Sequence, residues 1–331
     1  MKKFLGICLA AGMALALAAC GDKPPESYAV EVVGPERTSA PAPSQDPQAA
    51  TPRPGWLVAP RADLEITVSL AEYESPQQGT LTGQAQLAFF VQGGKTGVID
   101  LQGNVRIPAE KDVHWCPVCG ITNADESEIY DQNGGVVGSG GHGVSQSEIY
   151  YDLNSKQLYA MDMGWLFSWD QMQVTTAQPF IAQVAYIAPK EGEATPEDVY
   201  LDSTGEAVTV TQPAPAAYML MMPGGQPLDN VQYEQVNGAT EGLFATKKGG
   251  LWGFVNATTG QQAVPFVYSQ VRPFREGLAA VQTGTGWGYV DTAGSETTVM
   301  TFAGAQTAAG GAAWVKTAEG WGVAQLSQWG A

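Results

Sequence analysis

Short apolar runs separated by turn-forming residues occupy the chain from about residue 61 to its end. In residues 64–68, apolar and polar side chains alternate with the period of two that buries one face of a β-strand. Gly, Asn, Asp and Ser fill the intervals between such runs, and no long stretch repeats its apolar residues at the 3.6-residue period of a helix. The pattern therefore predicts an all-β domain.

One unit of this pattern recurs near the C-terminus. Trp252, Trp287 and Trp321 are 35 and 34 residues apart, and a short run opens nine residues before each of them. More diverged copies are predicted earlier, so that about six β-hairpin units end near positions 100, 152, 202, 256, 291 and 325. Because one hairpin cannot bury its apolar face alone, successive units must pack together. Two architectures fit such a chain: a propeller-like ring and an open superhelix.

The C-terminal copies resemble the WG-repeat family, whose unit reads Gly-Leu-Ala-x-Val, a turn, and then Gly-x-Trp-Gly-Tyr-Ile-Asp-x-x-Gly. The resemblance is strong over residues 240–325, moderate at 84–108, where Thr96 replaces the tryptophan, and weak between. It implies an extracytoplasmic repeat module and no catalytic residues. We therefore expect that the protein is not an enzyme.

Aromatic residues recur at fixed positions of these copies. As exposed platforms they would bind a sugar or a peptide, whereas one aromatic side chain at the same position of every unit is what core packing produces. We predict the core role. The residues concerned are Trp252, Trp287, Trp321, Tyr289 and Phe254.

Aspartates close four of the predicted units. Calcium loops have a dense Asp-x-Asp spacing, which none of these positions shows. Asp side chains also stabilise hairpin turns by accepting backbone hydrogen bonds. We therefore interpret Asp100, Asp152, Asp202 and Asp291 as turn residues.

The first twenty residues have the pattern of an export signal. Lys2 and Lys3 precede an uncharged apolar stretch, residues 4–19, which is shorter than a membrane-spanning helix requires. Residues 17–21 (LAACG) resemble the lipobox of bacterial lipoproteins. The resemblance implies a signal peptide over residues 1–19 and a mature N-terminus at Cys20 that carries acyl chains such as palmitate. Gly21 after this cysteine implies the periplasmic face of the outer membrane.

Residues 20–60 hold nine of the 21 prolines and few large apolar side chains. This composition predicts a disordered, lipid-anchored linker ahead of a repeat domain at 61–331. Loss of Lys2 and Lys3 with the leader would change the formal net charge from −17 to −19. Such a charge repels nucleic acid and anionic headgroups. Nucleic acid is therefore not an expected partner, and the membrane is expected to be reached through the lipid.

The most chemically specific residues lie in an insertion at about 109–147. Cys116 and Cys119 stand in the sequence HWCPVCG, which resembles both a thioredoxin-like redox pair and half of a zinc knuckle. The two histidines of the chain, His114 and His142, would complete a Cys2His2 metal site. We predict instead a Cys116–Cys119 disulfide, because an exported protein meets an oxidising compartment and these are the only cysteines after residue 20.

Together the patterns predict a non-enzymatic cell-envelope lipoprotein that acts as a β-repeat binding or scaffold module and needs no cofactor. Its expected partner is an envelope protein or polysaccharide. The alternative is an envelope thiol-redox or metal-binding protein that uses Cys116 and Cys119.

Overall fold

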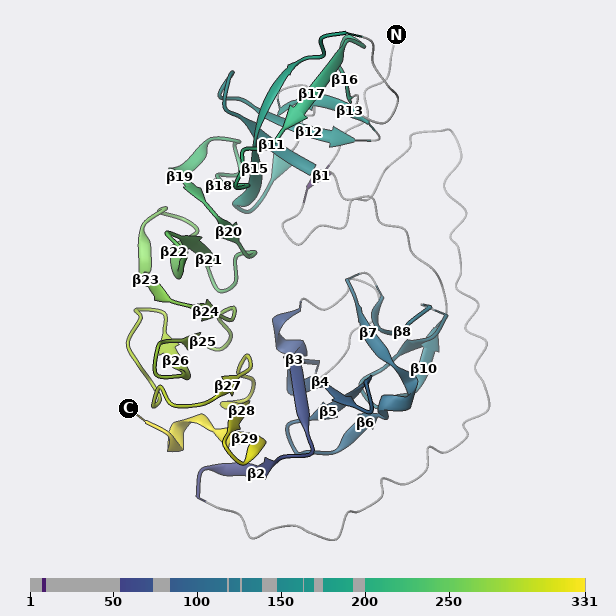
Figure 1. Cartoon of the computed structure of the whole chain (residues 1–331), viewed down its shortest axis with the longest axis vertical. Helices are drawn as coiled ribbons and strands as arrows, with labels where there is room; N and C mark the ends of the chain where they lie inside the picture. The colour runs from purple at the N-terminus through teal and green to yellow at the C-terminus, as the bar shows by residue number, and fades with distance from the viewer. Residues whose placement is uncertain are drawn as a thin grey trace. The chain divides into compact units, whose positions relative to one another are not determined.

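The computed structural model describes residues 8–9, 54–73, 84–117, 119–125, 127–138, 148–162, 164–169, 175–192 and 200–330. Their regular structure is almost entirely β, which confirms the all-β prediction (Figure 1). Within these residues, no helix has both the length and the apolar character needed to cross a bilayer. Contacts divide the chain into two compact units, residues 1–22 with 144–268 and residues 23–143 with 269–331.

Four sheets share one plan, in which a leading strand is followed by a hairpin and, in three of them, by a trailing strand. One belongs to the first unit and three belong to the second. The sheet of the first unit is β20 (Gln235–Val236), β21 (Leu243–Lys248), β22 (Leu251–Asn256) and β23 (Gln262–Tyr268). The first sheet of the second unit is β3 (Glu65–Ser69), β4 (Leu87–Gln92), β5 (Lys95–Asp100) and β6 (Val105–Ile107). The next is β24 (Gln270–Val271), β25 (Leu278–Gln282) and β26 (Trp287–Asp291). The last is β27 (Gly304–Ala305), β28 (Ala312–Thr317) and β29 (Gly320–Gln325) with β2 (Trp56–Arg61).

The hairpins of these four sheets have the same register. Each tryptophan pairs with the residue five positions before it, as Thr96 pairs with Val91. Thr96 therefore occupies the tryptophan position, which confirms the copy predicted at residues 84–108. The tryptophan pairs are Trp252 with Lys247, Trp287 with Gln282, and Trp321 with Lys316.

The glycine after each of these positions has a steric cause. A Cβ atom on Gly253 would lie 2.8 Å from the carbonyl oxygen of Val264, closer than real Cβ contacts come. The backbone of the following segment passes directly over the glycine, so any side chain there would push it away. The equivalent glycines Gly97, Gly288 and Gly322 would place a Cβ 2.6–2.7 Å from the carbonyl oxygens of Ile107, Val299 and Val58.

Aspartate side chains close the hairpins as predicted. Asp291 Oδ1 accepts the backbone N–H groups of Ala293 at 2.9 Å and Ser295 at 2.8 Å. These bonds hold the turn that leads out of the hairpin, so the turn interpretation is confirmed. Asp100, Asp152 and Asp202 accept N–H groups two to four residues later in the same manner, and Asn256 does so in its own copy.

Strand β2 corrects the predicted linker boundary. It pairs antiparallel with β29, with Trp56 opposite Ala324 and Arg61 opposite Trp321, so the first strand of the second unit completes its last sheet (Figure 1). The folded domain therefore includes residues 56–60, which were assigned to the linker. The proline content of residues 20–60 predicts a linker throughout, but a proline is compatible with an edge strand. β2 lies at the edge of its sheet, where Pro60 removes no hydrogen bond that the sheet needs.

The insertion predicted at about 109–147 contains a sheet of its own. After the 3₁₀ segment η3 (Ala109–Lys111), four strands form in the order β10-β9-β8-β7. Val113, Ile121 and Tyr130 from this sheet share a buried cluster with Leu87 and Phe89 of β4. The insertion is thus packed against the first repeat. Its strands are β7 (Val113–Cys116), β8 (Gly120–Asn123), β9 (Ile129–Tyr130) and β10 (Val136–Gly138).

The weakly matching middle of the chain folds differently from the repeats. The strands around Asp152 and Asp202, which were assigned to two separate units, lie in one sheet of order β11-β12-β13-β16-β17-β15-β18-β19. Parallel pairing of β11 with β15 closes six of these strands into a small barrel. The eight strands of the sheet are β11 (Glu148–Asp152), β12 (Leu158–Asp162), β13 (Trp165–Ser168), β15 (Phe180–Pro189), β16 (Tyr200–Asp202), β17 (Ala207–Thr211), β18 (Tyr218–Met221) and β19 (Pro227–Tyr233), of which β18 and β19 lie outside the barrel. Separately, β1 (Cys8–Leu9) pairs with β14 (Thr175–Thr176).

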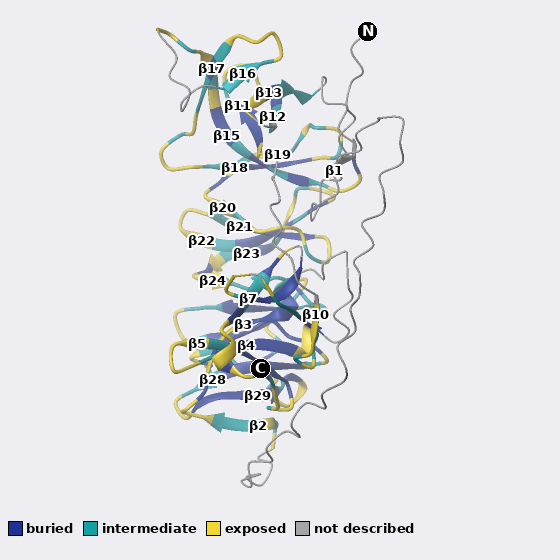
Figure 2. Cartoon of the chain, turned by 90° about the vertical axis from the view of Figure 1, so that its right-hand side faces the viewer, coloured by how far each residue is buried: buried dark blue, intermediate teal, exposed yellow. Residues whose placement is uncertain are grey.

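Consecutive sheets of the second unit share their cores. Trp287, Tyr289 and Phe302 belong to one buried cluster with Val315 and Ala324 of the next hairpin. In Figure 2 the hairpin strands of this unit are largely dark blue, whereas the edge strand β2 is mostly teal and many of the loops are yellow. The remaining 3₁₀ segments are η1 (Leu70–Glu72), η2 (Gln84–Gln86) and η4 (Leu326–Gln328).

Candidate functional site

The three repeat tryptophans differ in exposure. Trp287 and Trp321 each retain 5% of their accessible surface, and Tyr289 and Phe254 retain none. These four side chains occupy core positions. Trp252 has the same hairpin register but is only half-buried.

One side chain near the indole differs between the copies of Trp287 and Trp252. In the copy that contains Trp287, the guanidinium carbon of Arg272 lies 5.6 Å from the indole centroid. The Arg272 N–H donates to Ala280 O, and the Asn237 N–H donates to the equivalent carbonyl one copy earlier, that of Ala245. Asn237 thus stands where the next copy has Arg272. Its side chain is shorter and uncharged, so it cannot cover the indole of its own copy as an arginine does.

A hollow of about 380 Å³ opens beside Trp252. Two aromatic rings, two primary amides and one aliphatic side chain line it, and none of these described residues carries a charge. Such a surface combines stacking faces with hydrogen-bond donors and acceptors. Its residues are Tyr218 of β18, Gln235 and Val236 of β20, Asn237 just after β20, and Trp252 of β22.

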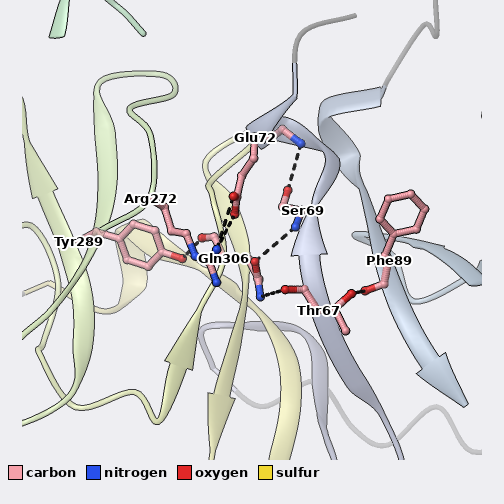
Figure 3. A network of polar contacts seen from close by, with 8 residues as sticks. Thr67, Ser69, Glu72, Phe89, Arg272, Tyr289 and Gln306 are labelled. Atoms are coloured by element: carbon pink, nitrogen blue, oxygen red, sulfur yellow. Dashed lines mark hydrogen bonds and ion pairs between the residues drawn. The ribbon is translucent and has the colours of Figure 1, made fainter. Parts of the chain in front are cut away.

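In the second unit, Gln306 occupies the repeat position that Asn237 has in the first unit. Its hydrogen bonds to neighbouring sheets form a polar joint in place of a hollow (Figure 3). Its amide nitrogen donates to the carbonyl of Thr67 at 3.1 Å, and its amide oxygen accepts the backbone N–H of Ser69 at 3.3 Å. Tyr289 Oη donates to the Gln306 carbonyl at 2.6 Å. Because Thr67, Tyr289 and Gln306 belong to three consecutive sheets, these bonds hold the sheets together.

An ion pair between Glu72 and Arg272 extends this joint, as Figure 3 shows. Arg272 Nη1 lies 3.3 Å from Glu72 Oε1, and the two side chains retain 15% (Glu72) and 27% (Arg272) of their accessible surface. Burial raises the pKa of Glu72, although the charge of Arg272 opposes that shift. Burial also raises the pKa of Tyr289. The ion pair links the end of η1 to the segment after β24, so its role is to join strands that are distant in the sequence.

The shared hairpin register, the Trp-Gly pair and the turn at its end together describe one repeating unit. Residues 252–284 match the WG containing repeat family. This match begins at Trp252 and extends through β25 toward the next tryptophan. No curated protein matches the chain significantly.

The predicted cysteine site lies outside residues 252–284, which match the WG containing repeat. Cys116 ends β7 and Cys119 precedes β8, and both are buried, with the Cys119 N–H donating to Cys116 Sγ at 3.1 Å. His114 Nε2 lies 3.2 Å from Thr122 Oγ1 across the hairpin. The disulfide stays a prediction. Among the residues that the structure describes, no three His, Cys, Asp or Glu side chains are grouped to hold a metal ion. Cys20 and His142 lie outside the described residues.

Sequence reasoning missed the residues beside Trp252. The signal was present in the alignment of the repeat copies, because Asn237, Arg272 and Gln306 are 35 and 34 residues apart, as the tryptophans are. Asn237 is the shortest of these three side chains, and it belongs to the copy whose tryptophan is only half-buried. Tyr218 had no such signal, since it comes from a strand that precedes this sheet.

Proposed function

We propose that this protein is a non-enzymatic binding module of the bacterial cell envelope, anchored by lipid at Cys20. The observation that carries the proposal is the unequal burial of equivalent tryptophans. Trp287 and Trp321 are covered within their cores, whereas Trp252 borders a hollow of about 380 Å³. Cavities that bind small ligands are typically about 300–1,000 Å³ and combine apolar walls with a few polar groups.

The repeat architecture supports a binding role. Rigid hairpins position the walls of the hollow, because Gln235 and Trp252 are on strands that pair with the same strand, β21. Preorganised walls lose little conformational freedom when a ligand binds, which favours affinity. Within the proposal, the sheet β20–β23 supplies the stable frame for this binding surface.

The leader supports the proposed location. A positively charged start, an apolar stretch and the LAACG sequence around Cys20 are features of an exported, acylated chain. The proline-rich residues that follow would hold the folded domain away from the bilayer. We place the protein at the periplasmic face of the outer membrane, where its hollow faces envelope components.

Replacement of the anchor cysteine tests this location. Cys20→Ser removes the sulfur that receives the diacylglyceryl group, so we expect the variant to leave the membrane fraction or to remain unprocessed. The measurement is fractionation of cells labelled with a radioactive fatty acid. Cys8→Ser is the matched control, because Cys8 lies in the part of the leader that would be removed. Labelled Cys20→Ser protein in the membrane fraction would contradict the anchor.

A further inference from the structure

We propose that the hollow beside Trp252 binds a neutral oligosaccharide. This inference rests on the proposed binding function and specifies the ligand class for it. The lining residues, the charge of the chain and the comparison between repeat copies all contribute to it.

The lining has the two kinds of group that a sugar ring requires. The C–H face of a pyranose packs on the flat apolar face of an aromatic ring, and Trp252 and Tyr218 offer such rings with polar edges. Sugar hydroxyl groups both donate and accept hydrogen bonds, and a primary amide does the same through its NH₂ and its oxygen. Gln235 and Asn237 place two exposed amides at this hollow.

Charge favours a neutral ligand. None of the five lining residues is cationic or acidic, and the nearest cation by strand register is Lys247 of β21, which pairs with both Gln235 and Trp252. The chain has a formal net charge of −17, which lowers the local concentration of anions near its surface. An uncharged, hydroxyl-rich molecule needs no charged partner in the lining and is not repelled by the negative net charge.

A peptide fits this surface less well. Peptides that add to a sheet edge gain affinity from a row of backbone hydrogen bonds and specificity from apolar pockets. β20, the edge strand here, is only two residues long, and Val236 is the one aliphatic side chain in the lining. Such an edge offers few backbone groups and no apolar pocket.

The adjacent WG repeat shows how to close the hollow without disturbing the hairpin. Arg272 occupies the position equivalent to Asn237 and covers the indole of Trp287 at 5.6 Å. Asn237→Arg therefore installs a side chain that this fold already accommodates one copy later. It should fill the space above Trp252 and exclude a ligand, while the backbone bond to Ala245 O remains.

The test is calorimetric titration of the full-length protein, in a detergent without a sugar headgroup, with three neutral hexasaccharides. The probes are the β-1,4-linked N-acetylglucosamine hexamer, cellohexaose and maltohexaose. We expect at least one of them to bind. We expect Trp252→Ala, Gln235→Ala and Asn237→Arg each to weaken that binding about tenfold or more, which corresponds to about 1.4 kcal/mol. Gln270→Ala, at the position equivalent to Gln235 in the next copy, should leave the affinity unchanged.

Three results would overturn the inference. Failure of all three hexasaccharides to bind the wild-type protein would exclude this ligand class, and tight binding of an uncharged hexapeptide in the same assay would do so as well. Binding that survives in both Trp252→Ala and Gln235→Ala would place the saccharide elsewhere on the protein. None of these results removes the proposed binding function, which is tested separately by crosslinking in cells. Gln235→Ala keeps the test decisive if Asn237→Arg fails to fold.

Discussion

Trp287→Ala is expected to lower the free energy of unfolding by about 3–5 kcal/mol, the usual cost of truncating a buried tryptophan. The side chain retains 5% of its accessible surface and packs with Tyr289 and Phe302. Its loss removes apolar burial and leaves a cavity that rigid hairpins cannot close. Because the same cluster contains Val315 and Ala324 of the following hairpin, the damage should spread to that repeat. Denaturant unfolding followed by circular dichroism measures the effect.

Trp252→Ala is the matched control for this substitution. Both residues hold the same register in their hairpins, but Trp252 is half-buried and borders a hollow. Truncation there removes less burial, so we expect a loss of about 1–2 kcal/mol. Equal losses in the two variants would show that Trp252 is as much a core residue as Trp287, and the binding interpretation would then be wrong.

Arg272→Met is expected to lower the free energy of unfolding by about 2–3 kcal/mol at pH 7, between the value for an exposed ion pair and that for a fully buried one. Methionine keeps an apolar stem over Trp287 but leaves Glu72 without its ion-pair partner. The double variant Glu72→Gln/Arg272→Met should recover most of this loss, because no buried charge remains. A double-mutant cycle on unfolding free energies measures the coupling, and simple additivity of the two losses would contradict it.

The pH dependence of the same variants follows from the raised pKa of Glu72. A carboxyl group that binds its proton more tightly in the folded state stabilises that state at low pH. This contribution is lost as the pH rises from the unfolded value of about 4.3 through the folded pKa. We therefore expect the deficit of Arg272→Met to shrink as the pH is lowered from 7 to 5, since protonation of Glu72 removes the buried charge that the variant leaves unpaired. Glu72→Gln, which has no proton to gain, should lack this component in unfolding experiments over the same range.

The repeats could be predicted from the sequence because their determinants are local. The Trp-Gly pair is required where a strand passes over the glycine, and the aspartate is required where a turn needs an acceptor, so both recur at fixed spacing. The barrel could not be predicted in this way. Its closure pairs β11 with β15 and β13 with β16 in parallel, between segments separated by more than 30 residues, and no local pattern records such pairing.

The candidate site was predicted in part. Trp252 was identified as a repeat aromatic, but the core role assigned to it fits Trp287 and Trp321 better. Its surroundings include Asn237, just after β20, at a position where the copy of Trp287 has an arginine over the indole. Periodicity alone reports what the copies share, whereas a binding site lies where one copy departs from the others.

Photocrosslinking in living cells tests the central claim most directly, because it asks whether this hollow contacts an envelope component. A diazirine amino acid would replace Val236, which lines the hollow, and in a second strain Val271, the equivalent residue of the next repeat. The proposal predicts one discrete crosslinked product from position 236, lost in the Trp252→Ala background, and none from position 271. Equal products from both positions, or none from either, would contradict the account.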